Sequence, residues 1–295
     1  MNEFNRYHPI VNFIYFVFAI VFSCIFLHPV TLVISLVCGF AYSVVLNGTG
    51  QVKRNLMYML PALLLMALIN PAFNHEGVTI LYYLPGGNPL TLESVYYGFL
   101  SATMIISVIL FFSCFNEVMT SDKIIYLFGR IIPSLSLIFS MTLRFIPRFT
   151  QQLKITVNSQ KCIGRDVQGR GIIKRVKSGI SILSIIITWS LENAIDTSDS
   201  MKSRGYGLKG RTAFSIYSFS KRDAKVLSVI LLLATYVIIG SIMGETYFNC
   251  FPFIQTADFS IYGLSVFAAY FTLLSIPIII EISEVIKWKS IHSEI

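Results

Sequence analysis

The chain has 295 residues, of which 55% are hydrophobic and 13% are charged, and its formal net charge is +8. With a mean hydropathy of +0.70, this composition excludes an ordinary soluble domain and predicts an integral membrane protein. The five cysteines are odd in number and scattered, without CxxC spacing, so the sequence suggests neither a disulfide framework nor a zinc site.

Six apolar runs approach or exceed the length of about 20 residues that a helix needs to cross a membrane, and they predict an all-α, polytopic fold. The runs cover residues 10–27, 29–46, 56–73, 95–115, 226–243 and 261–280. No small-residue cleavage site follows the first run, so we expect a retained helix rather than a signal peptide. A further apolar stretch, 178–191, has only 14 residues. We expect it to lie at the membrane interface or against protein.

The basic residues indicate both the domain organisation and the orientation. Eighteen of the twenty-three Lys and Arg residues lie between 116 and 225, whereas the connectors 73–94 and 244–260 contain none. By the positive-inside rule, the central region and both termini are expected to be cytoplasmic. We therefore predict four spans in residues 1–115, a cytoplasmic region in 116–225, and two spans with a tail in 226–295.

The six runs contain no Asp, Glu, Lys or Arg. Ion-coupled carriers keep ionisable groups inside the membrane, so a self-contained carrier of that kind is disfavoured. The histidines are far apart and none has HExxH spacing; they are His8, His28, His75 and His292. A stand-alone permease or channel remains one alternative function, and an integral membrane enzyme is a less favoured one.

Two amphipathic stretches dominate the basic centre. Apolar residues recur at steps of three and four over 138–157 and again over 172–201, which predicts two long helices. Arg144 and Arg148 fall on a different face of the first helix, and Pro147 is expected to kink it. Two such helices can pack along their apolar faces as a hairpin.

Each of these helices is predicted to end in a glycine, Gly164 in the first and Gly205 in the second. Glycine accepts the left-handed conformation that closes a helix, so both ends can be ordinary caps. Basic residues cluster there, namely Lys161, Arg165, Lys202 and Arg204. A cation is favourable at a helix C-terminus, and an arginine can also reach a partner's carboxylate as a bidentate fork. The pattern leaves both interpretations open: a structural hairpin, or two tips that dock into a partner.

Four short motifs occur in an order that resembles one family. The chain reads NPAFNHEGVT at 70–79, GNPLTLE at 87–93, LRFIP at 143–147 and SRGYG at 203–207. On these motifs it is similar, over nearly all of its length, to the transmembrane T component of energy-coupling factor (ECF) transporters. The resemblance implies a coupling helix pair whose framework includes Arg144, Pro147 and Arg148.

The resemblance also implies a function. In that family, the T component is a non-catalytic subunit of an ABC importer for vitamins or metal ions. Its two coupling helices end in Ala-Arg-Gly-like triplets that dock into two ATPase subunits, which bind the ATP and magnesium. The matching triplets here are Cys162-Ile163-Gly164 and Ser203-Arg204-Gly205. The T component also scaffolds a membrane substrate-binding subunit, and Asn70, Pro71 and His75 are the contacts that the resemblance implies for it.

The first triplet departs from the family because Ile163 stands where arginine is expected. Lys161 or Arg165 can supply the missing charge, although one step along a helix turns a side chain by about 100°. We therefore expect the first tip to dock through apolar contact or through Arg165, and the two ATPases to differ from each other.

Two glycine-rich stretches, 164–171 and 205–212, have a spacing like that of phosphate loops. Each has arginine where the phosphate-binding lysine belongs, and each follows a helix rather than a strand. We expect this chain to bind no nucleotide or other cofactor itself. The basic centre can attract anionic lipid headgroups, so the bilayer is an expected partner. Nucleic acid is not, because no aromatic stacking platform accompanies the charges.

Overall fold

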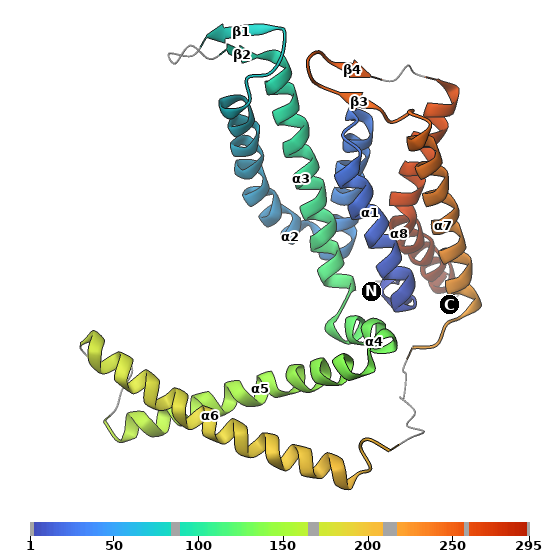
Figure 1. Ribbon diagram of the computed structural model, residues 1–295. Coiled ribbons are helices and arrows are strands. Elements are labelled where there is room, and N and C mark those ends of the chain that lie inside the picture. Colours follow the sequence, from blue (N-terminus) through green and yellow to red (C-terminus); the bar gives the residue numbers. More distant parts are fainter. Residues whose placement is uncertain (1–2, 84–88, 165–170, 209–216, 257–259, 294–295) are drawn as a thin grey trace. The chain divides into compact units, whose positions relative to one another are not determined.

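A computed structural model describes residues 3–83, 89–164, 171–208, 217–256 and 260–293, and helices dominate them (Figure 1). The elements in chain order are η1 (Phe4–Arg6), α1 (Pro9–Ile25), α2 (Pro29–Phe73), β1 (Ile80–Tyr83), β2 (Pro89–Thr91), α3 (Leu92–Val118), α4 (Ser121–Ile131), α5 (Pro133–Cys162), α6 (Ile172–Ser203), α7 (Lys221–Ile242), β3 (Phe248–Asn249), β4 (Gln255–Thr256) and α8 (Ile261–Ser293).

The chain folds as two compact units. The first combines residues 1–124 with 217–295, and the second is the intervening segment 125–216. Helices α1, α2, α3, α7 and α8 form a bundle in the first unit, together with the first residues of α4. The second unit contains the rest of α4 with α5 and α6. This unit lies within residues 116–225, the region that the sequence predicts to be cytoplasmic.

Among the described residues, five helices are long and apolar enough to cross a membrane. They are Pro29–Gly48, Leu92–Val118, Ile172–Ser203, Lys221–Ile242 and Ile261–Trp288. Two shorter apolar helices, Pro9–Ile25 and Pro61–Phe73, accompany them. The chain is therefore an all-α, polytopic membrane protein with two small β-hairpins, as its composition predicts, and each of the six predicted runs overlaps one of the bundle helices.

Helix α6 meets the same criterion of length and composition, although the sequence predicted that its apolar stretch is too short to cross. The difference arises because α6 is one continuous helix of 32 residues that extends far beyond 178–191. Both of its ends are basic, with Lys174 and Arg175 at one and Lys202 at the other. A spanning α6 would place one basic end outside the cell, against the positive-inside rule. A position for α6 outside the membrane remains our prediction, and it rests on this charge distribution.

The two hairpins lie at one end of the bundle, and the N-terminus lies at the other (Figure 1). Strands β1 and β2 are antiparallel, as are β3 and β4. Both hairpins belong to the connectors 73–94 and 244–260, which lack Lys and Arg. The two ends of the bundle therefore differ in charge, which is the asymmetry that the positive-inside rule uses.

Two His-Pro pairs start the first two bundle helices. The Nδ1 atom of His8 accepts a hydrogen bond of 3.3 Å from the Ile10 N–H, and His28 does the same for Val30. The proline that follows each histidine suits the first helical position, where its missing N–H costs nothing. Burial lowers the pKa of His28, which favours the neutral imidazole that an acceptor requires. Two histidines that the sequence left unassigned are therefore helix caps.

Helix α2 contains both the second and the third predicted run. Gly48 interrupts it with a φ of 71° and a ψ of 171°, so the helix is kinked there. Glycine adopts this left-handed φ without the steric cost that other residues meet. The two predicted runs end at residue 46 and begin at residue 56, but the structure has only a break at Gly48 between them, after which the helix resumes.

Aromatic rings fill much of the core of the bundle, and two of its tyrosines have hydrogen-bonded hydroxyl groups. Tyr15 and Tyr270 are at most 1% exposed. The Tyr15 hydroxyl donates to the Leu274 carbonyl at 2.9 Å, and the Tyr270 hydroxyl lies 2.6 Å from Ser35 Oγ. Within a membrane no water is present to satisfy such groups, so they must bond to one another. These bonds tie α8 to α1 and to α2.

Candidate functional site

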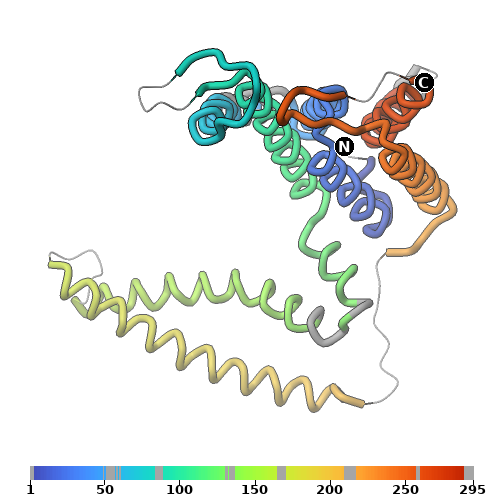
Figure 2. Tube along the Cα trace, turned by 45° about the horizontal axis from the view of Figure 1, so that its top comes forward, coloured from blue at the N-terminus to red at the C-terminus, as the bar shows by residue number. Residues whose placement is uncertain are grey.

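Helices α5 and α6 contact each other near their midpoints, and two views show the pair (Figures 1 and 2). The rings of Phe149 and Trp189 meet edge to face at 5.4 Å. The Arg148 guanidinium lies 5.9 Å from the centre of the Trp189 ring, within cation–π range. Arg148 therefore helps to join the two helices, as a framework residue would. Arg144 and Pro147 are exposed, and α5 continues as a helix through Pro147.

The two helices do not pack along the predicted apolar stripe of α6. Ile182 is 5% exposed and lies two turns from Trp189, on the face that meets α5. Six apolar residues of this stripe are each at least half exposed: Ile172, Val176, Ile180, Leu183, Ile187 and Leu191. The prediction of packing along this stripe was wrong: α6 meets α5 through Trp189, which is not part of the stripe.

The first tip is the C-terminal end of α5. The helix ends at Cys162, Ile163 is the capping residue, and Gly164 follows with a φ of +80°. The Gly164 N–H donates to the Lys161 carbonyl at 3.0 Å, which closes the last turn. The Ile163 side chain is 70% exposed. Arg165, the alternative source of charge at this tip, lies outside the described residues.

The second tip is the C-terminal end of α6. The helix ends at Ser203, Arg204 is the capping residue, and Gly205 follows with a φ of +77°. The Gly205 N–H donates to the Lys202 carbonyl at 3.0 Å, and the Tyr206 N–H donates to the Met201 carbonyl at 3.0 Å. This pair of bonds is the Schellman motif. Arg204 itself is exposed.

Ile163 and Arg204 therefore occupy the same position at the ends of two long helices. Each is the capping residue, and each is followed by a glycine in the left-handed region. This equivalence agrees with the predicted alignment of the two triplets. Chemically, Arg204 can offer a fork of N–H donors to a carboxylate, whereas Ile163 can offer only apolar contact.

At the far end of α2, Asn70 and Pro71 pack against α3. A Cβ atom on Gly98 would lie 3.2 Å from Asn70 Cβ and 3.3 Å from Pro71 Cδ, so only a glycine leaves room for this contact. The Asn70 side-chain oxygen is buried and has no hydrogen-bond partner within the described part of the chain. The contact of Asn70, Pro71 and His75 with another subunit remains a prediction.

The residues after α2 fold against the motif at 87–93. The Thr79 hydroxyl donates to Glu93 Oε1 at 2.5 Å, and the Thr91 hydroxyl donates to the Glu76 carbonyl at 2.7 Å. Gly77 has a φ of +137°, and a Cβ on it would lie 2.6 Å from Glu93 Oε2. Two motifs that the sequence treated separately thus contact each other through these hydrogen bonds.

About a third of the chain is similar in sequence to known proteins. No protein-family model matches the chain. Three curated relatives are each named "Energy-coupling factor transporter transmembrane protein EcfT". The protein of Lactobacillus helveticus is 40% identical over 110 residues, which are 37% of this chain and 39% of that protein. That of Lactococcus lactis subsp. cremoris is 33% identical over 108 residues (36% and 41%). That of Bacillus selenitireducens is 34% identical over 111 residues (37% and 41%).

The chain is EcfT-like. The matched stretches span about two fifths of the length of these relatives, and 36–37% of this chain. The four motifs, which are distributed from residue 70 to residue 207, predicted similarity over nearly all of the chain. The matched stretches are shorter than that.

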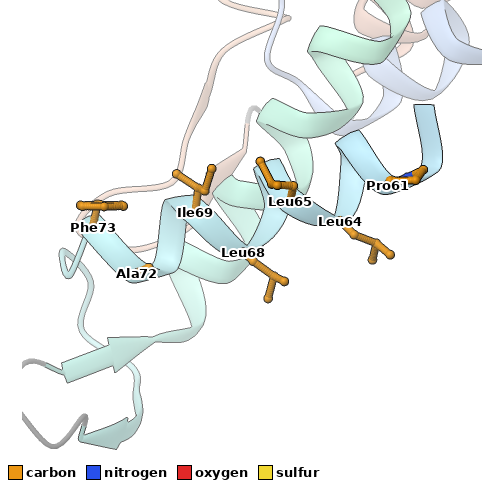
Figure 3. Close-up of a pocket in the computed structure, with 7 residues that line it drawn as sticks. All are labelled: Pro61, Leu64, Leu65, Leu68, Ile69, Ala72 and Phe73. Atoms are coloured by element: carbon orange, nitrogen blue, oxygen red, sulfur yellow. The ribbon is translucent and has the colours of Figure 1, made fainter. Parts of the chain in front are cut away.

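The EcfT-like chain also has a surface that the sequence did not indicate. An open hollow of about 470 Å³ runs along the last turns of α2 (Figure 3). It is lined by Pro61, Leu64, Leu65, Leu68, Ile69, Ala72 and Phe73. Phe73 is 82% exposed and Leu68 is 71% exposed. In an apolar run, hydrophobic residues look alike whether they face lipid or protein, so the sequence carried no signal for this face.

Proposed function

We propose that this chain is the transmembrane coupling and scaffold subunit of an ECF-type ABC importer for a vitamin or a metal ion. In this role it is not an enzyme: two partner ATPases hydrolyse ATP, and the chain transmits their motion to a membrane substrate-binding subunit. The observation that carries the proposal is the pair of helix ends with matching backbone and exposed capping residues, Ile163 and Arg204.

The two ends favour ATPase partners that differ from each other. An exposed arginine at a helix end suits a groove with a carboxylate, with which it can make a bidentate pair. An isoleucine that is 70% exposed suits an apolar groove, because burying its surface is favourable. Two identical grooves would leave one of these side chains mismatched.

The exposed apolar surfaces favour a membrane partner as well. The α6 stripe and the hollow along α2 each present several large side chains that are half exposed or more. Contiguous apolar faces of this kind mark interaction sites or membrane contact. The substrate-binding subunit and the bilayer are the partners that we propose for them.

The proposed location is the cell membrane, with both termini and the tips on the cytoplasmic side. The support is the distribution of charge: eighteen basic residues lie in 116–225, and none lies in the connectors that form the hairpins. ATP is available in the cytoplasm, so the ATPases and the tips must share that side.

Reconstitution into proteoliposomes tests the proposal. The chain would be purified alone and with co-expressed ATPase and substrate-binding subunits, and uptake of a panel of radiolabelled B vitamins, nickel and cobalt would be measured with and without ATP. We expect ATP-dependent uptake only in the complete complex. Uptake by the chain alone would favour a stand-alone permease, and a failure of any ATPase to co-purify would refute the coupling role.

A further inference from the structure

Most residues of the segment Glu3–His8 are buried within the bundle unit, although Arg6 is exposed. Phe4 is fully buried, Tyr7 is 7% exposed and His8 is 5% exposed. The Phe4 N–H donates to Glu281 Oε1 of α8 at 3.1 Å. This segment is held in place by specific contacts.

One set of contacts reaches α4. Lys123 is 5% exposed, and its ammonium donates to the Asn5 carbonyl at 2.5 Å and to Asn5 Oδ1 at 2.6 Å. In the amide orientation that satisfies its neighbours, Asn12 accepts a third bond from Lys123 at 2.9 Å and donates to the Phe4 carbonyl at 3.0 Å. Three oxygens thus meet the three donors of the ammonium.

The charged form of Lys123 dominates at neutral pH. Burial lowers the pKa of Lys123 to about 8, which still lies above pH 7. The oxygens that meet the ammonium belong to amide groups rather than to carboxylates. Burying a cation without a carboxylate partner is costly. We therefore assign Lys123 the role of fixing the position of Asn5 relative to α4 through directed hydrogen bonds.

A second set of contacts reaches the start of α7. Asp223 is 4% exposed and accepts from the His8 N–H at 3.2 Å. It also accepts from the Ser220 N–H at 2.8 Å and forms a capping box with Ser220. Beside it, the Arg222 guanidinium lies 4.3 Å from the centre of the Tyr7 ring, and the His8 and Phe219 rings meet at 5.2 Å.

These two sets of contacts lie at the two points where the chain leaves the bundle unit and returns to it. The second unit comprises residues 125–216. Lys123 is therefore two residues before it, and Phe219 and Ser220 are three and four residues after it. Glu3–His8 thus contacts the bundle-unit segments on both sides of the second unit.

We propose that Glu3–His8 is a clasp that holds together, within the bundle unit, the two segments between which the coupling-helix unit is inserted, with Lys123 and Asp223 as its positioning residues. This proposal rests on the proposed coupling function. A force received at Ile163 or Arg204 can reach the bundle through the chain connections at both ends of the second unit. A loose connection would absorb the motion by changing its backbone angles, whereas one tied down beside its exit from the bundle transmits it.

The test measures uptake per ATP hydrolysed in proteoliposomes that contain the complete complex. The substrate is the vitamin or metal ion that the wild-type complex takes up best from the panel named above. Lys123→Met removes the three hydrogen bonds at similar side-chain length. Asn5→Ala removes one acceptor and leaves Lys123 in place. Lys225→Met is the matched control, because Lys225 is an exposed lysine of the bundle unit, near the start of α7.

We expect Lys123→Met to lower uptake per ATP by about tenfold, the factor that corresponds to losing a hydrogen bond to a charged group. Asn5→Ala should lower it less, and Lys225→Met should leave it unchanged. ATPase subunits should still co-purify with all three variants. If Lys123→Met prevents assembly of the complex, uptake per ATP by the Asn5→Ala variant tests the clasp instead. Unchanged uptake per ATP in every variant that assembles would overturn the clasp.

A failure of the proposed function is visible separately. It would appear in the wild-type complex, as absent ATPase binding or absent uptake, before any variant is compared. A variant that binds ATPases and hydrolyses ATP at the wild-type rate but moves less substrate supports the clasp. A purely structural role would lower the amount of complex and leave its ratio of uptake to hydrolysis constant.

Discussion

The ends of α5 and α6 have the same backbone and different side chains. In both, the residue after the helix is the cap, a glycine follows with a φ of +80° or +77°, and the glycine N–H bonds to a lysine carbonyl at 3.0 Å. The cap is Ile163 in one helix and Arg204 in the other. The glycine thus closes both ends in the same way, and the capping residue is where their chemistry differs.

Because the backbone is shared and the capping residues differ, the two tips can keep one docking geometry while they select different partners. Specificity of this kind needs each cap to fit its own groove and to be poorly accepted by the other. An arginine in an apolar groove would be buried without a partner, and an isoleucine would leave a carboxylate unpaired. The predictions below separate the contribution of the caps from that of the glycines.

The largest effect is expected from Arg204→Ala. Removing one partner of a buried, hydrogen-bonded charge pair costs roughly 2–5 kcal/mol, so ATPase binding should weaken about 30-fold or more. Arg204→Lys should be intermediate, because an ammonium cannot form the bidentate fork. The measurement is a binding isotherm with purified ATPase subunits.

Lys202→Ala is the control for that experiment. Lys202 is close to Arg204 and exposed, and it forms only a surface pair of 3.8 Å with Asp199. Such pairs contribute about 0–1 kcal/mol, so binding should change little. Equal retention of the ATPases by the Arg204→Ala and Arg165→Ala chains would contradict a special role for Arg204.

A smaller effect is expected from Ile163→Asp. If the first tip docks through apolar contact, a carboxylate there is buried without a partner, and binding should weaken about tenfold, which corresponds to ~1.4 kcal/mol. Ile163→Leu should bind as the wild-type chain does. The readout is the fraction of each ATPase retained on the immobilised chain. A strong loss with Arg165→Ala and none with Ile163→Asp would assign the contact to Arg165 instead.

A local effect, on the helix ends themselves, is expected from the glycines. An L-residue in the left-handed region costs roughly 1–2 kcal/mol, so Gly164→Ala and Gly205→Ala should both open the ends of their helices. Gly205→Ala should cost more, since its Cβ would lie 3.1 Å from Leu208 Cδ1, whereas a Cβ on Gly164 meets nothing within 4 Å. Hydrogen exchange of peptides that cover each tip measures the difference. Faster exchange at Gly164 than at Gly205 would contradict it.

Local rules account for much of what the sequence predicted correctly. The bundle helices follow from apolar runs that the bilayer requires to be helical. The ends of α5 and α6 follow from Gly164 and Gly205, because a glycine after a long amphipathic stretch is a strong stop signal. The candidate tips could therefore be located, and their difference noticed, from residue identity alone.

Other features depend on contacts that have no local signature. The stripe of α6 predicted the wrong packing face, because hydrophobic periodicity reports which residues avoid water and not which neighbour covers them. Trp189 contacts Phe149 and Arg148 of α5, and the periodicity of α6 did not indicate this contact. The hollow beside Phe73 was missed for the same reason.

The sequence by itself determined a polytopic helical membrane protein, the basic region between its spans, and two glycine-closed helix tips with unlike caps. Those are properties of composition and of short-range backbone geometry. Only the tertiary structure brought Asn5 to Lys123 and His8 to Asp223, over separations of 118 and 215 residues. Such contacts depend on how the helices pack, and no pattern within either short segment encodes its distant partner.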